Sequence, residues 1–97
     1  MAAQKIIRVT EYCKHHQIET TFIKELHDND LIKLQYEKRT AYIPYSELSV
    51  LDRMVRMSRD LELNVPGILL VNQLLQRIKD HEQQIRELNS KLRLFDK

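Results

Sequence analysis

Cysteine and histidine side chains that could bind a metal lie close together near the start of the chain. Cys13 and His16 are three residues apart in a segment expected to be helical, with His15 and His27 nearby. A zinc site usually takes four such ligands at regular spacing, and a second Cys/His pair does not follow. The pattern predicts a packed cysteine and solvated histidines, with no metal and no cofactor.

Residues that could perform catalysis are equally sparse. The chain contains one glycine, and no segment has the spacing of a nucleophile elbow or of a glycine-rich phosphate loop. We therefore expect a protein that is not an enzyme. Arg53, Arg56 and Arg59, spaced three residues apart, could form a basic patch for an acidic protein surface or for phosphates. The alternative is a solvated helix face whose charge is partly neutralised by Asp52 and Asp60.

Composition limits the classes of partner. The 97 residues suit one small domain, and the net charge of +2 is too small to identify a nucleic-acid-binding protein. Residues 1–50 carry seven basic and seven acidic residues, whereas residues 51–97 carry nine and seven. The single cysteine excludes an internal disulfide, and no apolar stretch is long enough to span a bilayer. We therefore expect a cytoplasmic protein without a membrane partner.

The pattern of apolar residues and chain breakers predicts a mainly α-helical chain with a small β-hairpin. A short edge strand is expected over residues 5–9, followed by a helix that Thr10 caps. A second helix is expected over residues 19–30. Two β-prone runs, 31–36 and 41–43, then form the hairpin around a polar connector.

Two further helices complete the predicted chain. The third begins at Ser46 or Ser49, either of which can cap it. Asn64 can cap the last helix, and nothing after it interrupts helix formation. We therefore expect a head over residues 1–63 and a long amphipathic dimerisation helix over residues 64–97.

An apolar seam with heptad spacing runs along this last helix. Its positions follow one another at alternating steps of three and four residues, as in a coiled coil: Val71, Leu74, Ile78, His81, Ile85, Leu88, Leu92 and Phe95. We expect the positions from Ile78 onward to form a homodimer, with His81 as a polar position that fixes register; the orientation stays open. The start of the helix, residues 68–75, is expected to pack on the head. The alternative is that the stripe covers the chain's own core.

The order of the elements resembles a MerR-like winged helix-turn-helix head with its dimerisation coil. The segment from Leu48 to Leu75, in which Leu61-Glu62-Leu63-Asn64-Val65-Pro66-Gly67-Ile68 precedes the long helix, resembles the chaperone modulator family of the CbpM type. Val9-Thr10-Glu11-Tyr12-Cys13 also resembles the first helix of that family. The resemblance implies a protein that binds the J-domain of a DnaJ-like, CbpA-type cochaperone and so limits its access to an Hsp70 chaperone.

The second helix departs from that of DNA-binding MerR regulators, which usually carries an arginine followed by two aromatic residues. Lys24, Glu25 and Leu26 stand at these positions, and Glu25 would repel phosphates. This departure argues against nucleic acid as the partner. The residues expected to contact the J-domain are charged: Glu11, Glu25, Asp28, Asp30, Arg53, Arg56 and Arg59. The alternative function is a MerR-like DNA-binding transcriptional regulator that uses Lys24, Lys33, Lys38 and Arg39.

Overall fold

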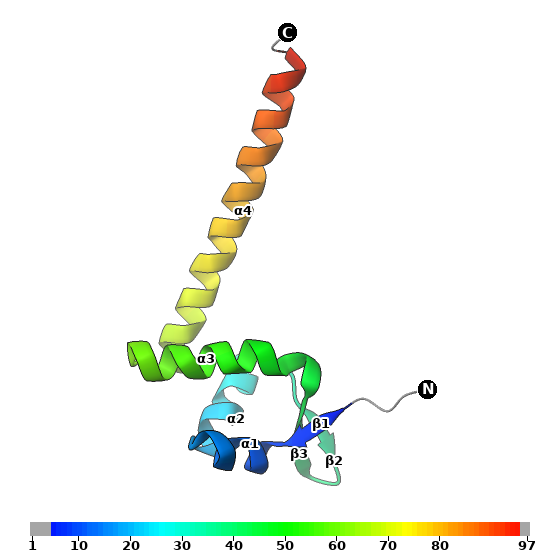
Figure 1. Ribbon diagram of the computed structural model, residues 1–97, viewed down its shortest axis with the longest axis vertical. Coiled ribbons are helices and arrows are strands. Elements are labelled where there is room, and N and C mark those ends of the chain that lie inside the picture. The colour runs from blue at the N-terminus through cyan, green and yellow to red at the C-terminus, as the bar shows by residue number, and fades with distance from the viewer. Residues whose placement is uncertain (1–4, 96–97) are drawn as a thin grey trace.

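The computed structural model describes residues 5–95, and this part of the chain is mainly helical with a small sheet. The elements follow in the order β1 (Ile6–Arg8), α1 (Val9–His16), α2 (Thr20–Asp28), β2 (Gln35–Glu37), β3 (Thr40–Pro44), the 3-10 turn η1 (Tyr45–Glu47), α3 (Leu48–Leu61) and α4 (Val65–Phe95). Figure 1 shows a small head, which includes every element up to α3, and a long α4 that projects from it. The predicted fold, mainly α with a hairpin and a long C-terminal helix, is confirmed.

The sheet joins the first strand to the predicted hairpin. Its strand order is β1-β3-β2, both pairings are antiparallel, and Ile7 lies opposite Ile43. The hairpin is confirmed, but its first strand is shorter than predicted and begins at Gln35. The leucine and isoleucine side chains between residues 31 and 34 pack on the core, so this segment serves the core and not the sheet.

The hairpin turn places two basic residues in a backbone conformation that usually favours glycine or asparagine. Lys38 and Arg39 have φ values of 48° and 69°, both in the left-handed region. Two consecutive left-handed residues form the turn type that matches the twist of a two-residue hairpin. The strands on either side fix this turn, although the sequence lacks the Asn-Gly pair that usually predicts it.

Only the predicted cap of the last helix is confirmed. Thr10 lies inside α1, which begins directly after β1, so the threonine does not cap that helix. Neither Ser46 nor Ser49 caps α3, because the helix begins directly from η1 and no side chain caps it. The cap of α4 is confirmed, since Asn64 Oδ1 accepts a hydrogen bond of 2.9 Å from the Gly67 N–H.

The core lies between α1, α2, α3 and the sheet, and the first turn of α4 packs against it. Its largest fully buried side chains are Ile23, Leu26, Ile43, Leu51, Met54 and Ile68. The Tyr12 hydroxyl donates a hydrogen bond of 2.6 Å to Asp52 Oδ1, which ties α1 to α3. Burial and this hydrogen bond raise the pKa of Tyr12 well above its usual value.

Most of α4 lies outside the head. Val65 and Ile68 belong to the core, whereas Leu70, Leu74 and Leu75 are between 41% and 55% exposed. Of the residues 68–75 that were predicted to pack on the head, Ile68 is buried in the core, whereas these three leucines keep much of their surface exposed. The alternative, in which the whole stripe covers the chain's own core, is wrong. The reason is geometric: α3 lies across the base of α4 and meets one side of its first turns (Figure 1).

The projecting helix gives the molecule an extended shape, 62 Å along its longest axis. None of the helices in residues 5–95 is long and apolar enough to cross a membrane.

Candidate interaction surfaces

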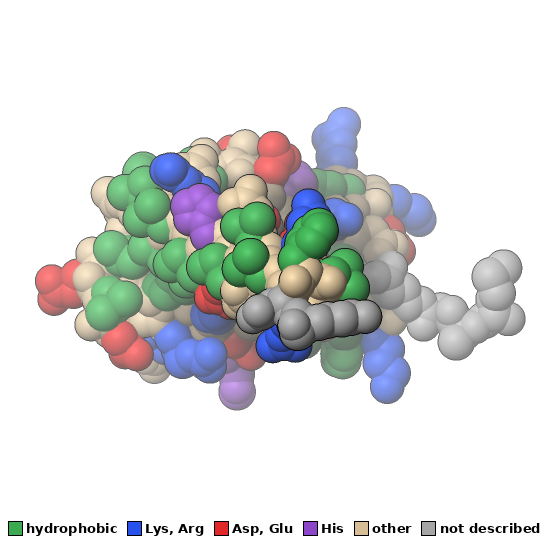
Figure 2. Space-filling view, turned by 90° about the horizontal axis from the view of Figure 1, so that it is seen from above, with side chains coloured by type: hydrophobic (Ala, Val, Ile, Leu, Met, Phe, Trp, Pro, Cys, Tyr) green, Lys and Arg blue, Asp and Glu red, His purple; other side chains and the backbone are tan. Residues whose placement is uncertain are grey.

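The six predicted dimerisation residues form one exposed stripe along α4, which we call the α4 seam: Ile78, His81, Ile85, Leu88, Leu92 and Phe95. Its five apolar side chains are between 52% and 88% exposed. At about 100° per residue, the α4 seam lies on the side of the helix opposite Val65 and Ile68, and so faces away from the head. Viewed from the C-terminal end of α4, hydrophobic side chains gather over the helix and the neighbouring end of the head (Figure 2). An apolar stripe of this length indicates association with another chain.

The opposite side of α4 satisfies its polar side chains by itself. Gln76 donates to Asp80 at 3.1 Å, Gln83 donates to Glu87 at 3.0 Å, and Arg86 donates to Gln83 at 2.7 Å. Pairs of this kind, one helical turn apart, stabilise an exposed helix by about 0.2–0.5 kcal/mol each. This polar side of the helix is stable when exposed to solvent, so the α4 seam is the side that is available for association.

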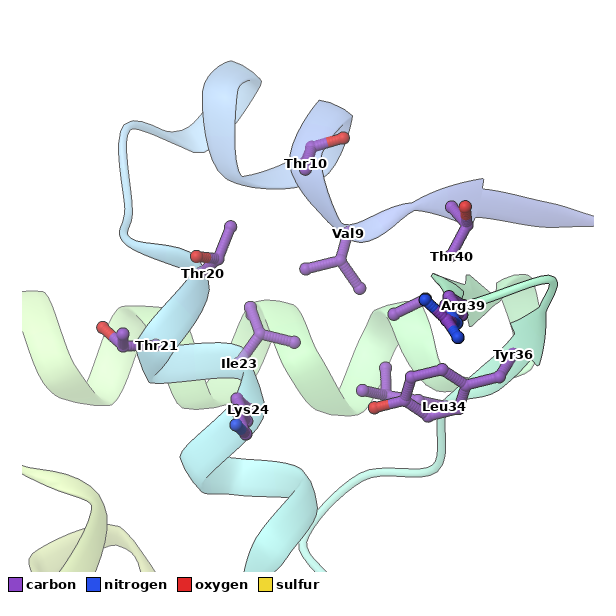
Figure 3. Close-up of a pocket in the computed structure, with 11 residues that line it drawn as sticks. Val9, Thr10, Thr20, Thr21, Ile23, Lys24, Leu34, Tyr36, Arg39 and Thr40 are labelled. Carbon is purple, nitrogen blue, oxygen red and sulfur yellow. The ribbon is translucent and has the colours of Figure 1, made fainter.

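A groove of about 440 Å³ lies between α1, α2 and the hairpin, and we call it the head groove. Val9, Ile23, Leu34 and Ala41 supply its apolar lining. Val9 and Ile23 are also buried members of the core, so packing holds this lining in place. Figure 3 shows Val9, Ile23 and Leu34 between the two helices and the hairpin, with polar side chains around them.

The charged residues that line the head groove are both cationic. Lys24 comes from the exposed side of α2, and Arg39 comes from the hairpin turn (Figure 3). No aspartate or glutamate of the described chain lines the groove. Glu25 lies on the part of the exposed α2 surface that is farther from the groove. The arrangement can hold an apolar group with an anion beside it.

The structure brings together two of the four predicted DNA-binding residues. Lys24 and Arg39 share the head groove, whereas Lys33 and Lys38 lie outside it. The main-chain N–H of Lys33 donates a hydrogen bond of 2.6 Å to Glu47 Oε1, which fixes the segment before the hairpin against η1.

The acidic residues predicted to contact a partner lie on the exposed surface of the first two helices and the loop that follows. Glu11 is on α1, Glu25 and Asp28 are on α2, and Asp30 follows α2 with a φ of 59°. Glu25 and Asp28 are neighbours on one helix face, while Glu11 is on a different helix.

The three arginines of α3 lie apart from the head groove. Arg56 and Arg59 line a depression between α1 and α3, together with His16, Asp52 and Asp60. Arg53 lies nearby on the same helix, beside Asp60 and Leu61. Aspartates on both sides of the arginines reduce the positive charge of this face.

Sequence reasoning missed most residues of the head groove. Thr10, Thr20, Thr21 and Thr40 line it together with Tyr36. They come from α1, α2 and both strands of the hairpin, and no spacing in the sequence places them side by side. The available signal was Lys24, an exposed cation beside two threonines on a predicted helix.

Cys13 and His16 take part in packing, whereas His15 is exposed as predicted. Cys13 is buried, and burial raises the pKa of its thiol. The ring of His16 stacks on that of Tyr12 with centroids 4.1 Å apart. Within residues 5–95, no three His, Cys, Asp or Glu side chains are grouped so that they could hold a metal ion.

Comparison with known protein families identifies the family of this chain. Residues 7–90 match the family model described as MerR HTH family regulatory protein. No curated protein gives a significant match. The matched range runs from β1 through α1, α2, the hairpin and α3 into α4. The chain therefore belongs to the MerR HTH family of regulatory proteins.

Proposed function

We propose that this protein is a non-catalytic regulator that binds the J-domain of a DnaJ-like, CbpA-type cochaperone and so limits the access of that J-domain to Hsp70. The sequence resemblance to CbpM-type chaperone modulators suggests this partner. Inhibition by occupancy requires affinity alone, and the head offers a groove and exposed charged side chains for binding.

The observation that carries the proposal is the charge of the surface that a DNA-binding head would present. Helix α2 has one basic residue, Lys24, and two acidic ones, Glu25 and Asp28, for a net charge of −1. The hairpin has Glu37 against Lys38 and Arg39, for a net charge of +1. The two charges sum to zero. DNA binding depends on neutralising phosphates with cations, whereas a protein partner is well matched to a surface of mixed charge.

Within this proposal, the exposed acidic residues of the head meet the basic helix that J-domains display. Glu25 and Asp28, as neighbours on α2, are the centre of that contact, with Glu11 and Asp30 beside them. The arginines of α3, Arg53, Arg56 and Arg59, are assigned to acidic groups at the edge of the same partner.

The proposal includes a homodimer formed by the α4 seam. Burying large apolar side chains that are half exposed or more in a single chain is strongly favourable. His81 is the polar position of the α4 seam and is expected to fix its register. The dimerisation helix of this proposal is the predicted range 64–97 and the head is the range 1–63, of which residues 1–4 and 96–97 lie outside the part of the chain that the structure describes.

A second candidate is a DNA-binding transcriptional regulator of the MerR type. The observation in its favour is that Lys24 of α2 and Arg39 of the hairpin line one groove, where both could contact the same backbone. Lys33 and Lys38 would add contacts to phosphates on either side.

Titration of the purified protein with a CbpA-type J-domain and with duplex DNA, at 50 and 300 mM salt, tests the proposal. We expect saturable J-domain binding at both salt concentrations and duplex binding that is weak at 50 mM and lost at 300 mM. Tight duplex binding that falls steeply with salt, with no J-domain affinity, would establish the second candidate instead.

A further inference from the structure

The head groove combines a fixed apolar lining with a cationic rim. We propose that it receives one apolar side chain of the partner protein, together with a neighbouring carboxylate that Lys24 and Arg39 hold. This inference rests on the proposed function, because it names the part of a protein partner that the head recognises.

The size and lining of the groove fit an apolar anchor. Its volume of about 440 Å³ lies in the range of sites that take small ligands, so it has room for one apolar side chain and the carboxylate beside it. Val9 and Ile23 are packed in the core, and Leu34 and Ala41 are partly buried against it. The lining is therefore formed before the partner arrives, which lowers the entropy cost of binding.

The rim fits a carboxylate. Lys24 and Arg39 approach the groove from α2 and from the hairpin, and no acidic side chain of the described chain shares the lining with them. An arginine fork can hold both oxygens of a carboxylate, and a lysine adds a point charge. Threonine hydroxyls around the rim can bond the partner's main chain.

Charge complementarity selects a protein segment over a nucleic acid backbone. Phosphates would match the two cations but would leave the apolar lining uncovered. Glu25 and Asp28, on the same exposed α2 surface as Lys24, would also repel a continuous line of phosphates. A protein segment with an acidic residue beside an apolar one, and basic residues farther along, matches the whole surface.

Charge reversal at the rim tests the proposal on the full-length protein. We expect Lys24→Glu and Arg39→Glu each to weaken binding of a CbpA-type J-domain about tenfold or more. Lys14→Glu is the matched control, because Lys14 is an exposed lysine on α1 that does not line the groove; its affinity should equal that of the wild type. If the J-domain binds all four proteins equally, the groove is not the contact, although the proposed function stands.

A second measurement is independent of the partner. Methyl NMR spectra of the protein are recorded with 4-methylpentanoate and with the neutral 4-methylpentanamide at equal millimolar concentration. We expect the acid to shift the methyl signals of Leu34 and Ala41, the partly exposed apolar residues of the lining, more than the amide does, and Arg39→Glu to abolish the difference. Equal shifts with both probes, or shifts away from the groove, would overturn the inference even if the J-domain itself fails to bind.

Discussion

Replacing Ile85 with aspartate probes the α4 seam at its middle. Ile85 is 56% exposed in the single chain, so about half of its side chain remains to be buried by a partner. Loss of that burial costs about 1 kcal/mol per chain. The new carboxylate adds about 1–3 kcal/mol per chain for desolvation without a partner group. For two chains the dimer loses about 4–8 kcal/mol, which raises the dimer dissociation constant roughly a thousandfold or more.

Ser90→Asp is the matched control for this variant. Ser90 is exposed on the side of α4 away from the seam, so it receives the same new charge without changing the seam. Sedimentation velocity across a concentration series should show dimers for the wild type and Ser90→Asp, and monomers for Ile85→Asp. Circular dichroism is used as a control to check that all three proteins keep the folded head. Equal self-association of Ile85→Asp and the wild type would refute the assignment of the seam.

Three further predictions concern the head and its junction with α4. Tyr12 has a raised pKa, so the unfolded chain loses the phenol proton first as pH rises. Ionisation of Tyr12 should therefore leave the free energy of unfolding unchanged below pH 10 and lower it by about 1.4 kcal/mol per pH unit above pH 10. Urea titrations of Tyr12→Phe should lack this decline at high pH, and the same slope in both proteins would exclude Tyr12 as its source. Asn64→Ala should lower the free energy of unfolding by about 1 kcal/mol, because the Gly67 N–H loses its acceptor; an unchanged urea midpoint would show that the cap contributes nothing. Glu62 ends α3 with a φ of 54°, so Glu62→Gly should raise stability by about 1 kcal/mol, whereas a lower melting temperature would contradict strain at this residue.

Local patterns in the sequence were sufficient to predict the elements of the head and the long helix. The apolar periodicity of α2 and α4, and the amide of Asn64, act over a few residues and can be read from one segment. The turn at Lys38 and Arg39 could not be predicted in this way. Its left-handed backbone is fixed by pairing of β2 and β3, which outweighs the preference of the two residues.

For the candidate surfaces too, features within one helix could be predicted from the sequence, whereas features that depend on contacts between elements could not. The α4 seam was predicted because all its residues lie on one helix. That Leu70 and Leu74 are exposed was not predicted, because periodicity identifies an apolar side but not the body that covers it. The head groove depends on α1, α2 and the hairpin, which meet only in the fold. Lys24 and Arg39 were selected from their charge, whereas Val9 and the threonines around them were not.

The function proposed above is regulation of a chaperone system by occupancy of a J-domain. Its most direct test is the ATPase rate of Hsp70 stimulated by a CbpA-type cochaperone, measured with increasing amounts of the wild-type protein. We expect stimulation to fall to the basal Hsp70 rate near stoichiometric binding, while the basal rate without cochaperone stays constant. Stimulation that persists at saturating protein would show that the protein does not occupy the J-domain.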